Sequence, residues 1–290
     1  MSDKQKILVQ LDADALPSVF DRIVAVDAGA DQVFAYGGVK PESVRDLVHG
    51  CIFTRGPKDL HRTAIFIGGS DVAAGEAILA AVRATMLPQY GLQVSVLLDS
   101  NGANTTAAAA VRAAAKNLNL ANTPALVLGG TGPVGQRVAR LLARAGSDVR
   151  IGSRQKERAE AVCEALRQQV PGARVEAVST ASSGDAPNAL AGRVLVVAAG
   201  AAGVVLLPKK VRAASATLQM AIDLNAVPPA GIEGVEAMDA GVKRDGVLSY
   251  GALGVGSAKM KIHKAAIAKL FERNDQVFDA EQVYELAQEF

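Results

Sequence analysis

Short apolar runs alternate with helical patterns along most of the chain. The runs predict strands at 6–11, 32–35, 51–54, 63–67, 93–98, 125–128, 148–152, 174–178, 193–198 and 218–224. Between them we expect helices at 41–48, where apolar residues recur at helical spacing, at the alanine-rich 104–118 and at 155–169. Ser70 is the expected N-cap of the helix that follows 63–67, and the polar stretch 179–188 is expected to be a surface loop. Strands that alternate with helices are typical of parallel sheets, so we expect an α/β fold.

One strand leads into a glycine-rich turn. The apolar run 125–128 is followed by Gly130-Thr131-Gly132-Pro133-Val134-Gly135, which fits the dinucleotide pattern G-x-G-x-x-G, and an amphipathic stretch comes next. In this pattern the first glycine allows the turn, the second lets a pyrophosphate approach the backbone, and the third lets helix and strand pack closely. Proline suits the first helical position, and free N–H groups there favour phosphate. The interpretation is a Rossmann nucleotide site; the alternative is a structural turn without a ligand.

The residues at the end of the next strand indicate whether the site binds NAD or NADP. An NAD site usually carries Asp or Glu there to bind the ribose 2′-hydroxyl. The sequence instead has Ser153-Arg154, and Arg can pair with a phosphate through two parallel hydrogen bonds. We therefore predict NADP, with NAD tolerated.

Further cofactor contacts are expected after later strands. Ala199 and Gly200 follow the run 193–198, and Asn225 follows the run 218–224. Gly254 belongs to a second glycine-rich stretch, Gly251-Ala252-Leu253-Gly254-Val255-Gly256. These four positions complete the predicted cofactor-binding set.

Composition excludes several classes of protein. The net charge of +2 gives no argument for nucleic acid or an anionic membrane, and the absence of Trp disfavours base stacking. The most apolar stretch, 194–207, is too short to span a bilayer. Cys51 and Cys163 have no metal or redox spacing and are expected to be buried, and His49, His61 and His263 are isolated. No secretory signal is evident, so we expect a cytoplasmic protein that uses no metal.

The 290 residues predict two domains. Residues 1–122 form the expected substrate domain, and residues 123–254 form the Rossmann domain. In open parallel sheets, ligands gather beyond the carboxyl ends of the strands. The first domain places polar residues at such ends, and we take five as substrate-binding candidates: Asp12, Asp14, Ser100, Asn101 and Asn104. The alternative for each of these residues is a structural role, in which its side chain stabilises a turn or caps a helix.

Four segments resemble the bacterial NAD(P)-dependent methylene-tetrahydromethanopterin dehydrogenases, in the same order along the chain. They are residues 10–21, the segment 99–109 that begins Asp99-Ser100-Asn101-Gly102, the glycine turn 130–135 and the tail 251–256. The similarity extends to Lys259-Met260-Lys261-Ile262-His263-Lys264-Ala265. The resemblance implies a pterin-binding α/β domain and a Rossmann domain with a cleft between them, and C-terminal helices in 255–290 that complete the first domain. It also implies a homo-oligomer, a trimer by analogy.

The activity implied is hydride transfer from methylene-tetrahydromethanopterin to NADP⁺ or NAD⁺. Nitrogen lone pairs of the substrate push the hydride out, so the cationic product forms without proton transfer, and positioning supplies much of the rate. Carboxylates at the strand ends, with Asp99 as the catalytic candidate, would stabilise the developing charge. Lys259 is the expected active-site lysine and would orient the pterin; the alternative is a solvated helix residue.

Other functions remain open at this stage. A related dehydrogenase could act on methylene-tetrahydrofolate or on shikimate-like acids, although the latter need a lysine–aspartate pair, and Lys58-Asp59 lies in an expected loop. A non-catalytic NADP sensor is an alternative of another class, and measurable turnover distinguishes it from an enzyme.

Overall fold

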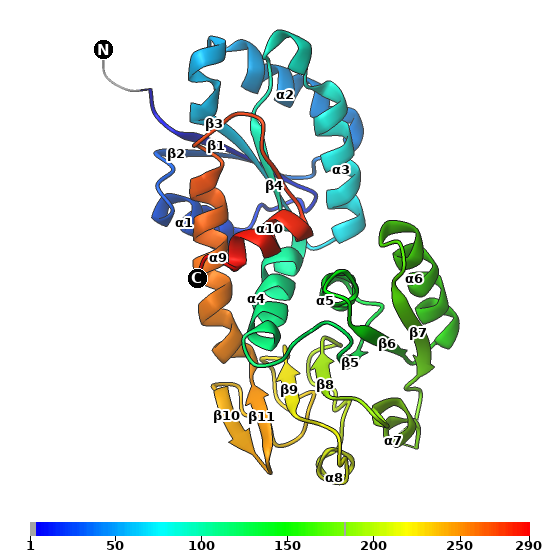
Figure 1. Ribbon diagram of the computed structural model, residues 1–290. Coiled ribbons are helices and arrows are strands. Elements are labelled where there is room, and N and C mark those ends of the chain that lie inside the picture. Colours follow the sequence, from blue (N-terminus) through cyan, green and yellow to red (C-terminus); the bar gives the residue numbers. More distant parts are fainter. Residues whose placement is uncertain (1–3, 183) are drawn as a thin grey trace. The chain divides into compact units, whose positions relative to one another are not determined.

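The computed structural model describes residues 4–182 and 184–290, and the backbone forms two compact units (Figure 1). The first unit comprises the chain up to residue 105 together with 260–290, and the second comprises 106–259. Two helices cross these limits, α4 (Ala103–Ala115) and α9 (Ala252–Lys269). The α/β class predicted from the sequence is confirmed.

The first unit is built on a five-stranded parallel sheet in the order β12-β4-β3-β1-β2. Its strands are β1 (Ile7–Asp12), β2 (Gln32–Tyr36), β3 (Thr63–Gly68), β4 (Ser95–Leu98) and β12 (Val277–Phe278). All six residues of β3 are buried, as expected for a central parallel strand that is covered on both faces. The strand order changes direction between β1 and β3, and this point is where ligands bind in open α/β sheets.

Helices cover both faces of this sheet. They are α1 (Val19–Asp27), α2 (Val44–Phe53), α3 (Val72–Thr85), α10 (Ala280–Ala287) and the end of α9, with short 3-10 turns at Pro41–Ser43, Pro57–Arg62, Pro88–Tyr90 and Ser100–Gly102. Val9 and Leu11 of β1 share a buried core with Val48 of α2 and Ile78 of α3. Figure 1 shows α2 and α3 on one side of the sheet and α1 on the other.

Two local predictions in this unit are wrong. The predicted strand at 51–54 is the end of α2, because Val44, Val48, Cys51 and Ile52 form one buried helical face. The predicted N-cap of α3 at Ser70 is also wrong. Asp71 caps this helix, and its carboxylate accepts hydrogen bonds from the N–H groups two and three residues on.

The second unit has a seven-stranded sheet in the order β10-β11-β9-β8-β5-β6-β7. The strands are β5 (Pro124–Leu128), β6 (Asp148–Ser153), β7 (Arg174–Ser179), β8 (Leu195–Ala198), β9 (Met220–Asp223), β10 (Ala240–Arg244) and β11 (Val247–Tyr250). Only the β10–β11 pair is antiparallel among the described strands. The order from β7 to β11 is that of the Rossmann dinucleotide fold, which confirms the predicted fold class.

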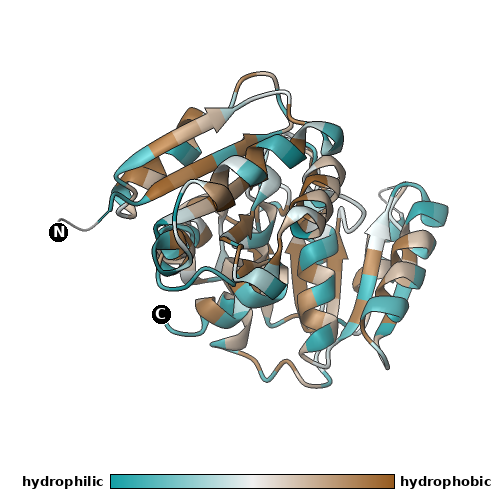
Figure 2. Ribbon diagram, turned by 90° about the horizontal axis from the view of Figure 1, so that it is seen from above, coloured by the Kyte–Doolittle hydropathy of each residue, from teal (hydrophilic) through white to brown (hydrophobic). Residues whose placement is uncertain are grey.

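Helices α5 (Pro133–Arg144), α6 (Lys156–Gln169), α7 (Asp185–Leu190) and α8 (Lys209–Ala213) complete this unit. Helix α7 falls in a stretch that we expected to be a loop, and its small buried face consists of Ala186, Ala189 and Leu190. In the view of Figure 2, apolar residues concentrate in the strands, whereas the helices alternate apolar and polar residues. No described helix combines the length and the apolar character needed to cross a membrane.

Candidate functional site

The glycine loop joins β5 to α5 in the second unit, at the point where the strand order changes direction. The left-handed backbone conformation lies at Gly129, with φ of 67°, and not at Gly130, where we expected the turn to need it. Pro133 is the first residue of α5, as predicted.

The three glycines of the motif differ in what surrounds them. A Cβ on Gly130 would lie 2.7 Å from Ile151 Cγ2, and one on Gly135 would collide with the backbone oxygen of Gly129. Close packing therefore explains why Gly130 and Gly135 are both glycine. A Cβ on Gly132 would lie 3.4 Å from the nearest atom, so its surroundings leave room for a methyl group. Packing therefore does not require glycine at this position, unlike at the other two.

The N-terminus of α5 suits an anion. Gly132 occupies the N-cap position, and no described side chain makes a capping hydrogen bond there. The first N–H groups of a helix and its dipole favour a negatively charged ligand. Thr131 and Val134 flank this end, and the Thr131 carbonyl accepts a hydrogen bond from the Gln136 side chain over 2.8 Å. These residues fit the pyrophosphate of a dinucleotide.

The end of β6 lies beside this loop. The N–H of Gly130 donates to the carbonyl of Gly152 over 3.0 Å, so Ser153 and Arg154 follow directly next to it. Ser153 is buried, and its hydroxyl accepts from the N–H of Gln155, whereas Arg154 is exposed. An exposed guanidinium beside the glycine loop fits a 2′-phosphate, because it is not committed to the protein core.

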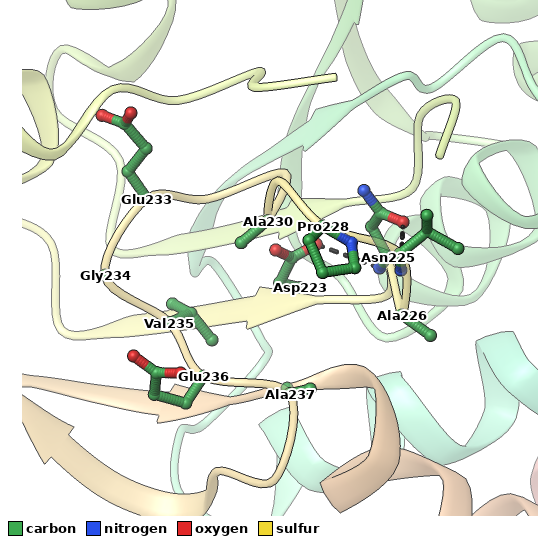
Figure 3. Close-up of a pocket in the computed structure, with 12 residues that line it drawn as sticks. Asp223, Asn225, Ala226, Pro228, Ala230, Glu233, Gly234, Val235, Glu236 and Ala237 are labelled. Carbon is green, nitrogen blue, oxygen red and sulfur yellow. Dashed lines mark hydrogen bonds between the residues drawn. The ribbon is translucent and has the colours of Figure 1, made fainter. Parts of the chain in front are cut away.

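The ends of β8 and β9 complete this edge of the sheet. Ala199 and Gly200 follow β8, and a Cβ on Gly129 would lie 2.5 Å from Gly200 Cα, so the two loops touch. Beyond β9, a pocket of about 320 Å³ is lined by Asp223, Asn225 and residues of the segment that follows (Figure 3). The Asn225 side chain is engaged within this segment: it donates to the Pro229 carbonyl and accepts from the Val227 N–H.

Asp223 lines this pocket, and its carboxylate holds the surrounding loop in place. Its carboxylate accepts hydrogen bonds from the N–H groups of Asn225 at 3.0 Å and Ile232 at 2.9 Å. Burial raises the pKa of this carboxyl, and these N–H groups partly offset the shift. The predicted contact Gly254 lies in the first turn of α9, where a Cβ would collide with the Asp239 carbonyl, so close packing is enough to require glycine there.

In the first unit, the ends of β1, β3 and β4 bring four of the five predicted substrate residues to one edge. Asp12 ends β1, and a Cβ on Gly69 would lie 3.0 Å from its carboxylate oxygen. Ser100 donates to the Gly68 carbonyl over 2.7 Å, and the Asn101 N–H donates to the Gly69 carbonyl over 2.6 Å. Asn101 adopts a left-handed conformation with φ of 56°.

Two aspartates organise the loops at this edge. Asp12 is buried and accepts hydrogen bonds from the N–H groups of Asp14 and Ser18. Asp14 in turn accepts from both the N–H and the hydroxyl of Ser70, over 2.9 and 2.8 Å. From the sequence we expected Ser70 only to cap the helix that follows β3. Its contact with Asp14 was therefore not predicted.

Of the remaining predicted residues, Asp99 and Asn104 are buried, whereas Lys259 is partly exposed. Asp99 is buried and accepts from the Thr105 N–H over 3.0 Å and the Thr105 hydroxyl over 2.6 Å. Asn104 donates to the Leu98 carbonyl and to Asp279, which caps α10. Lys259 lies on α9, four residues before His263, whose ring stacks on Phe66 in the first unit.

The cysteines are buried, as predicted. Burial raises the pKa of the Cys51 thiol to about 12, so it stays protonated at neutral pH. Burial also raises the pKa of Cys163. In residues 4–182 and 184–290, no group of three metal-ligating side chains comes together.

Two α/β units, one of which carries a glycine loop at its Rossmann switch point, define the class of two-unit dinucleotide-dependent dehydrogenases. Solved structures support this fold. Quinate dehydrogenase from Corynebacterium glutamicum in complex with NAD superimposes with a TM-score of 0.55 at 15% identity, covering 99% of this chain and 100% of that one. The ligand-free 5-ketofructose reductase of Gluconobacter sp. strain CHM43 gives a TM-score of 0.54 at 13% identity, covering 99% of both chains.

Sequence comparison identifies the family. The family model described as methylene-tetrahydromethanopterin dehydrogenase, N-terminal, matches residues 19–101, and that described as NADP oxidoreductase, coenzyme F420-dependent, matches 125–198. The bifunctional protein MdtA of Methylorubrum extorquens is 44% identical over 98% of this chain and 99% of its own length. The NAD(P)-dependent methylenetetrahydromethanopterin dehydrogenase of the same organism is 30% identical over 94% of both chains. The chain therefore belongs to the methylene-tetrahydromethanopterin dehydrogenase family, which confirms the resemblance found in the sequence.

Proposed function

We propose that this protein transfers a hydride from methylene-tetrahydromethanopterin to NADP⁺, with NAD⁺ as a possible second acceptor, and releases methenyl-tetrahydromethanopterin in one-carbon metabolism. The observation that carries the proposal is similarity over almost the whole chain to a relative named for this reaction, combined with an intact glycine loop.

We propose that the second unit holds the cofactor. The start of α5 would bind the pyrophosphate, and Arg154 with Ser153 would face the 2′-phosphate. Ala199, Gly200, Asn225 and Gly254 are the residues proposed for the nicotinamide end. When bound, the cofactor supplies an electrophilic ring carbon that accepts the hydride.

The first unit would hold the pterin at the switch point between β1 and β3. The proposed contacts are Asp12 at the end of β1, Asp14, Ser100 and Asn101 in the segments after β1 and β4, and Asn104 at the start of α4. The substrate nitrogens release the hydride without an acid or base, so the product acquires a positive charge. Nearby carboxylates stabilise such a charge, most strongly where water is excluded.

Asp99 and Lys259 are the proposed catalytic residues. Asp99 is fixed by two hydrogen bonds from Thr105, so its carboxylate is preorganised. Lys259 would orient the pterin without acting as a base, because the reaction involves no proton transfer.

The decisive experiment is a methenyl-pterin absorbance assay with purified protein and methylene-tetrahydromethanopterin, run with NADP⁺ and with NAD⁺. Methylene-tetrahydrofolate is run in parallel. Rapid formation of the methenyl product from the methanopterin substrate supports the proposal. Turnover of the folate alone would replace the proposed substrate, and NADP binding without turnover of either pterin would favour a cofactor sensor.

Variants test the two catalytic assignments in the same assay. Lys259→Ala is compared with Lys261→Ala, an exposed lysine two residues further along the same helix. Asp99→Asn is compared with Asp71→Asn, which removes a charge from a helix cap near the same edge. If Lys259→Ala and Asp99→Asn both keep kcat/KM within about twofold, a shift of only ~0.4 kcal/mol, both assignments are withdrawn.

We further propose that the protein is a cytoplasmic homo-oligomer. A trimer is expected from the resemblance to the family, and sedimentation equilibrium with purified protein measures the number of copies.

A further inference from the structure

Ser70 follows β3 at the edge of the sheet where the pterin is proposed to bind. Its N–H donates to one carboxylate oxygen of Asp14 over 2.9 Å, and its hydroxyl donates to the other oxygen over 2.8 Å. The two residues are 56 positions apart in the sequence and meet because β1 and β3 are neighbours in the sheet (Figure 1). Each oxygen of this carboxylate therefore has a partner, and together the two hydrogen bonds define the orientation of the group.

Other contacts already hold the loop that carries Ser70. Asp71, and not Ser70, caps α3 by accepting hydrogen bonds from the N–H groups two and three residues on. The carbonyl of Gly69 accepts from the Asn101 N–H over 2.6 Å, so backbone atoms alone connect the loop after β3 to the loop after β4. The helix cap and the backbone therefore make no use of the Ser70 hydroxyl, which binds Asp14 instead.

The backbone of Asp14 is likewise held without help from its own side chain. Its N–H donates to the buried carboxylate of Asp12 over 3.0 Å, and its carbonyl accepts from the Gly38 N–H over 2.7 Å. These two hydrogen bonds determine the course of the chain after β1. The contact with Ser70 adds something different, because it determines where the carboxylate of Asp14 lies.

The position of this pair at the surface makes the orientation of the carboxylate matter. Asp14 is half-buried and Ser70 is exposed, so the carboxylate is partly accessible to solvent. An accessible aspartate side chain without a partner samples several rotamers. A carboxylate stabilises a developing positive charge most effectively when its position is set in advance, because no reorganisation is then needed during the reaction.

We propose that Ser70 is a positioning residue, which holds the carboxylate of Asp14 in place for the positive charge that the pterin acquires as it releases the hydride. The inference rests on the proposed function and adds to its site a residue that was not among the expected contacts. Ser70 acts through Asp14. Because the reacting carbon is neutral in the substrate and cationic in the product, the effect of Ser70 grows as the reaction proceeds.

The test compares the affinity of Ser70→Ala for the two pterins, measured by equilibrium titration, and its kinetics in the absorbance assay. The variant loses the hydroxyl bond to Asp14 and keeps the N–H bond. We expect kcat to fall about 10-fold and the Kd of the cationic methenyl product to rise about 10-fold, while KM and the Kd of the methylene substrate stay within about twofold. Ser70→Thr keeps a hydroxyl and should restore all four quantities to within about twofold of the wild type.

Asp71→Ala is the matched control, because it perturbs the same loop without touching Asp14. It removes the cap of α3 and should lower the free energy of unfolding, measured by urea unfolding. The ratio of its two pterin dissociation constants should equal that of the wild type. Ser70→Ala should show the opposite pattern, with an altered ratio and nearly unchanged stability, and a purely structural role of Ser70 would not produce this pattern.

A double-mutant cycle with Asp14→Asn completes the test. In that background Ser70→Ala should change kcat and the product Kd by less than about twofold, since the group that it positions has lost its charge. The proposal is overturned if Ser70→Ala weakens both pterins equally or neither, if the two substitutions act independently, or if Asp14→Asn is fully active.

Failure of the proposed function has a different signature. A wild type that binds the pterins without turning them over contradicts the proposed function alone, and the two dissociation constants then still decide the role of Ser70. A wild type that binds neither pterin overturns both proposals.

Discussion

The two sheets carry different residues at the same topological position, the loop where the strand order changes direction. In each, the first strand–helix connection lies where the strand order changes direction. In the second unit this connection is glycine-rich, and α5 begins with no capping side chain among the described residues. In the first unit it contains Asp12 and Asp14, and Ser18 caps α1 by accepting a hydrogen bond from the N–H of Asp21.

In open α/β sheets the topology determines where a ligand binds, and we propose that in this protein the loop residues determine which charge the ligand carries. A helix N-terminus without a capping side chain, together with a guanidinium, suits the anionic phosphates of a dinucleotide. Carboxylates beside a helix whose start is already capped suit a ligand that becomes cationic. A hydride transfer that creates a cation needs both environments, one for each reactant.

The largest effect is expected at the glycine loop. Gly135→Ala places a methyl group against the Gly129 and Gly130 backbone, so we expect it to lower the free energy of unfolding by about 1–3 kcal/mol and to abolish NADP binding. Gly132→Ala should preserve stability, because space exists for its Cβ, yet weaken NADP binding because the methyl group blocks the ligand. Urea unfolding and calorimetric titration measure the two effects. An unchanged NADP affinity in Gly132→Ala would contradict the pyrophosphate role.

A smaller effect is expected at the end of β6. Arg154→Ala should weaken NADP binding by about 10–100-fold, the cost of about 1.4–2.7 kcal/mol when charge-assisted hydrogen bonds to a phosphate are lost. NAD affinity should stay the same, since NAD lacks that phosphate. Arg158→Ala, an exposed arginine one turn into α6, serves as the control. Equal losses for NADP and NAD would eliminate the proposed role of Arg154.

A smaller effect on stability is expected when the N-cap of α1 in the first unit is removed. Ser18→Ala removes the cap of α1 and should lower the free energy of unfolding by about 1 kcal/mol. NADP affinity should not change, because the cofactor is proposed to bind the other unit. Thermal unfolding with and without NADP provides the measurement, and a marked loss of NADP affinity in this variant would argue against separate ligand sites.

The smallest effect concerns pH and the carboxylate at the end of β9. Burial raises the pKa of Asp223 above the ordinary 3.8, so the folded state favours its protonated form. Its contribution to stability is therefore complete below pH 3.8 and is lost as the pH rises through the raised value. Asp223→Asn should remove this loss, so its stability relative to wild type should improve as the pH rises from 3.8 towards neutrality. Urea unfolding across this range tests the sign, and a flat difference would show that the pKa is not raised.

The sequence predicted the second unit better than the first because its signals are local. The loop Gly130–Gly135, the proline at N1 and the following strand all lie within about thirty residues, as the dinucleotide motif requires. The β10–β11 hairpin was nevertheless missed, although Asp245-Gly246 is a strong hairpin signal and both residues have positive φ. Strand β10 is polar and its pairing is irregular at Ala240 to Val242, and the four residues of β11 are too few for alternation to reveal a strand.

In the first unit, the decisive contacts are distant in sequence. Nothing local shows that Ser70 binds Asp14, 56 residues away, because the pairing depends on β1 and β3 being neighbours. The two-residue strand β12 is similarly invisible until β4 lies beside it. At 51–54 a short apolar run was compatible with a strand or a helix. This segment continues helix α2, because its apolar residues are buried on the same helical face as Val44 and Val48.

The position of β12 has a consequence for synthesis of the protein. Every strand of the second sheet precedes β12 along the chain, whereas the first sheet begins with β1 and is completed by residues 277–278. On the ribosome, the Rossmann sheet can therefore assemble while the pterin-side sheet still waits for its last strand. For that interval the nascent chain presents an incomplete sheet with β4 at an open edge, and this is the stage at which a chaperone would protect it best.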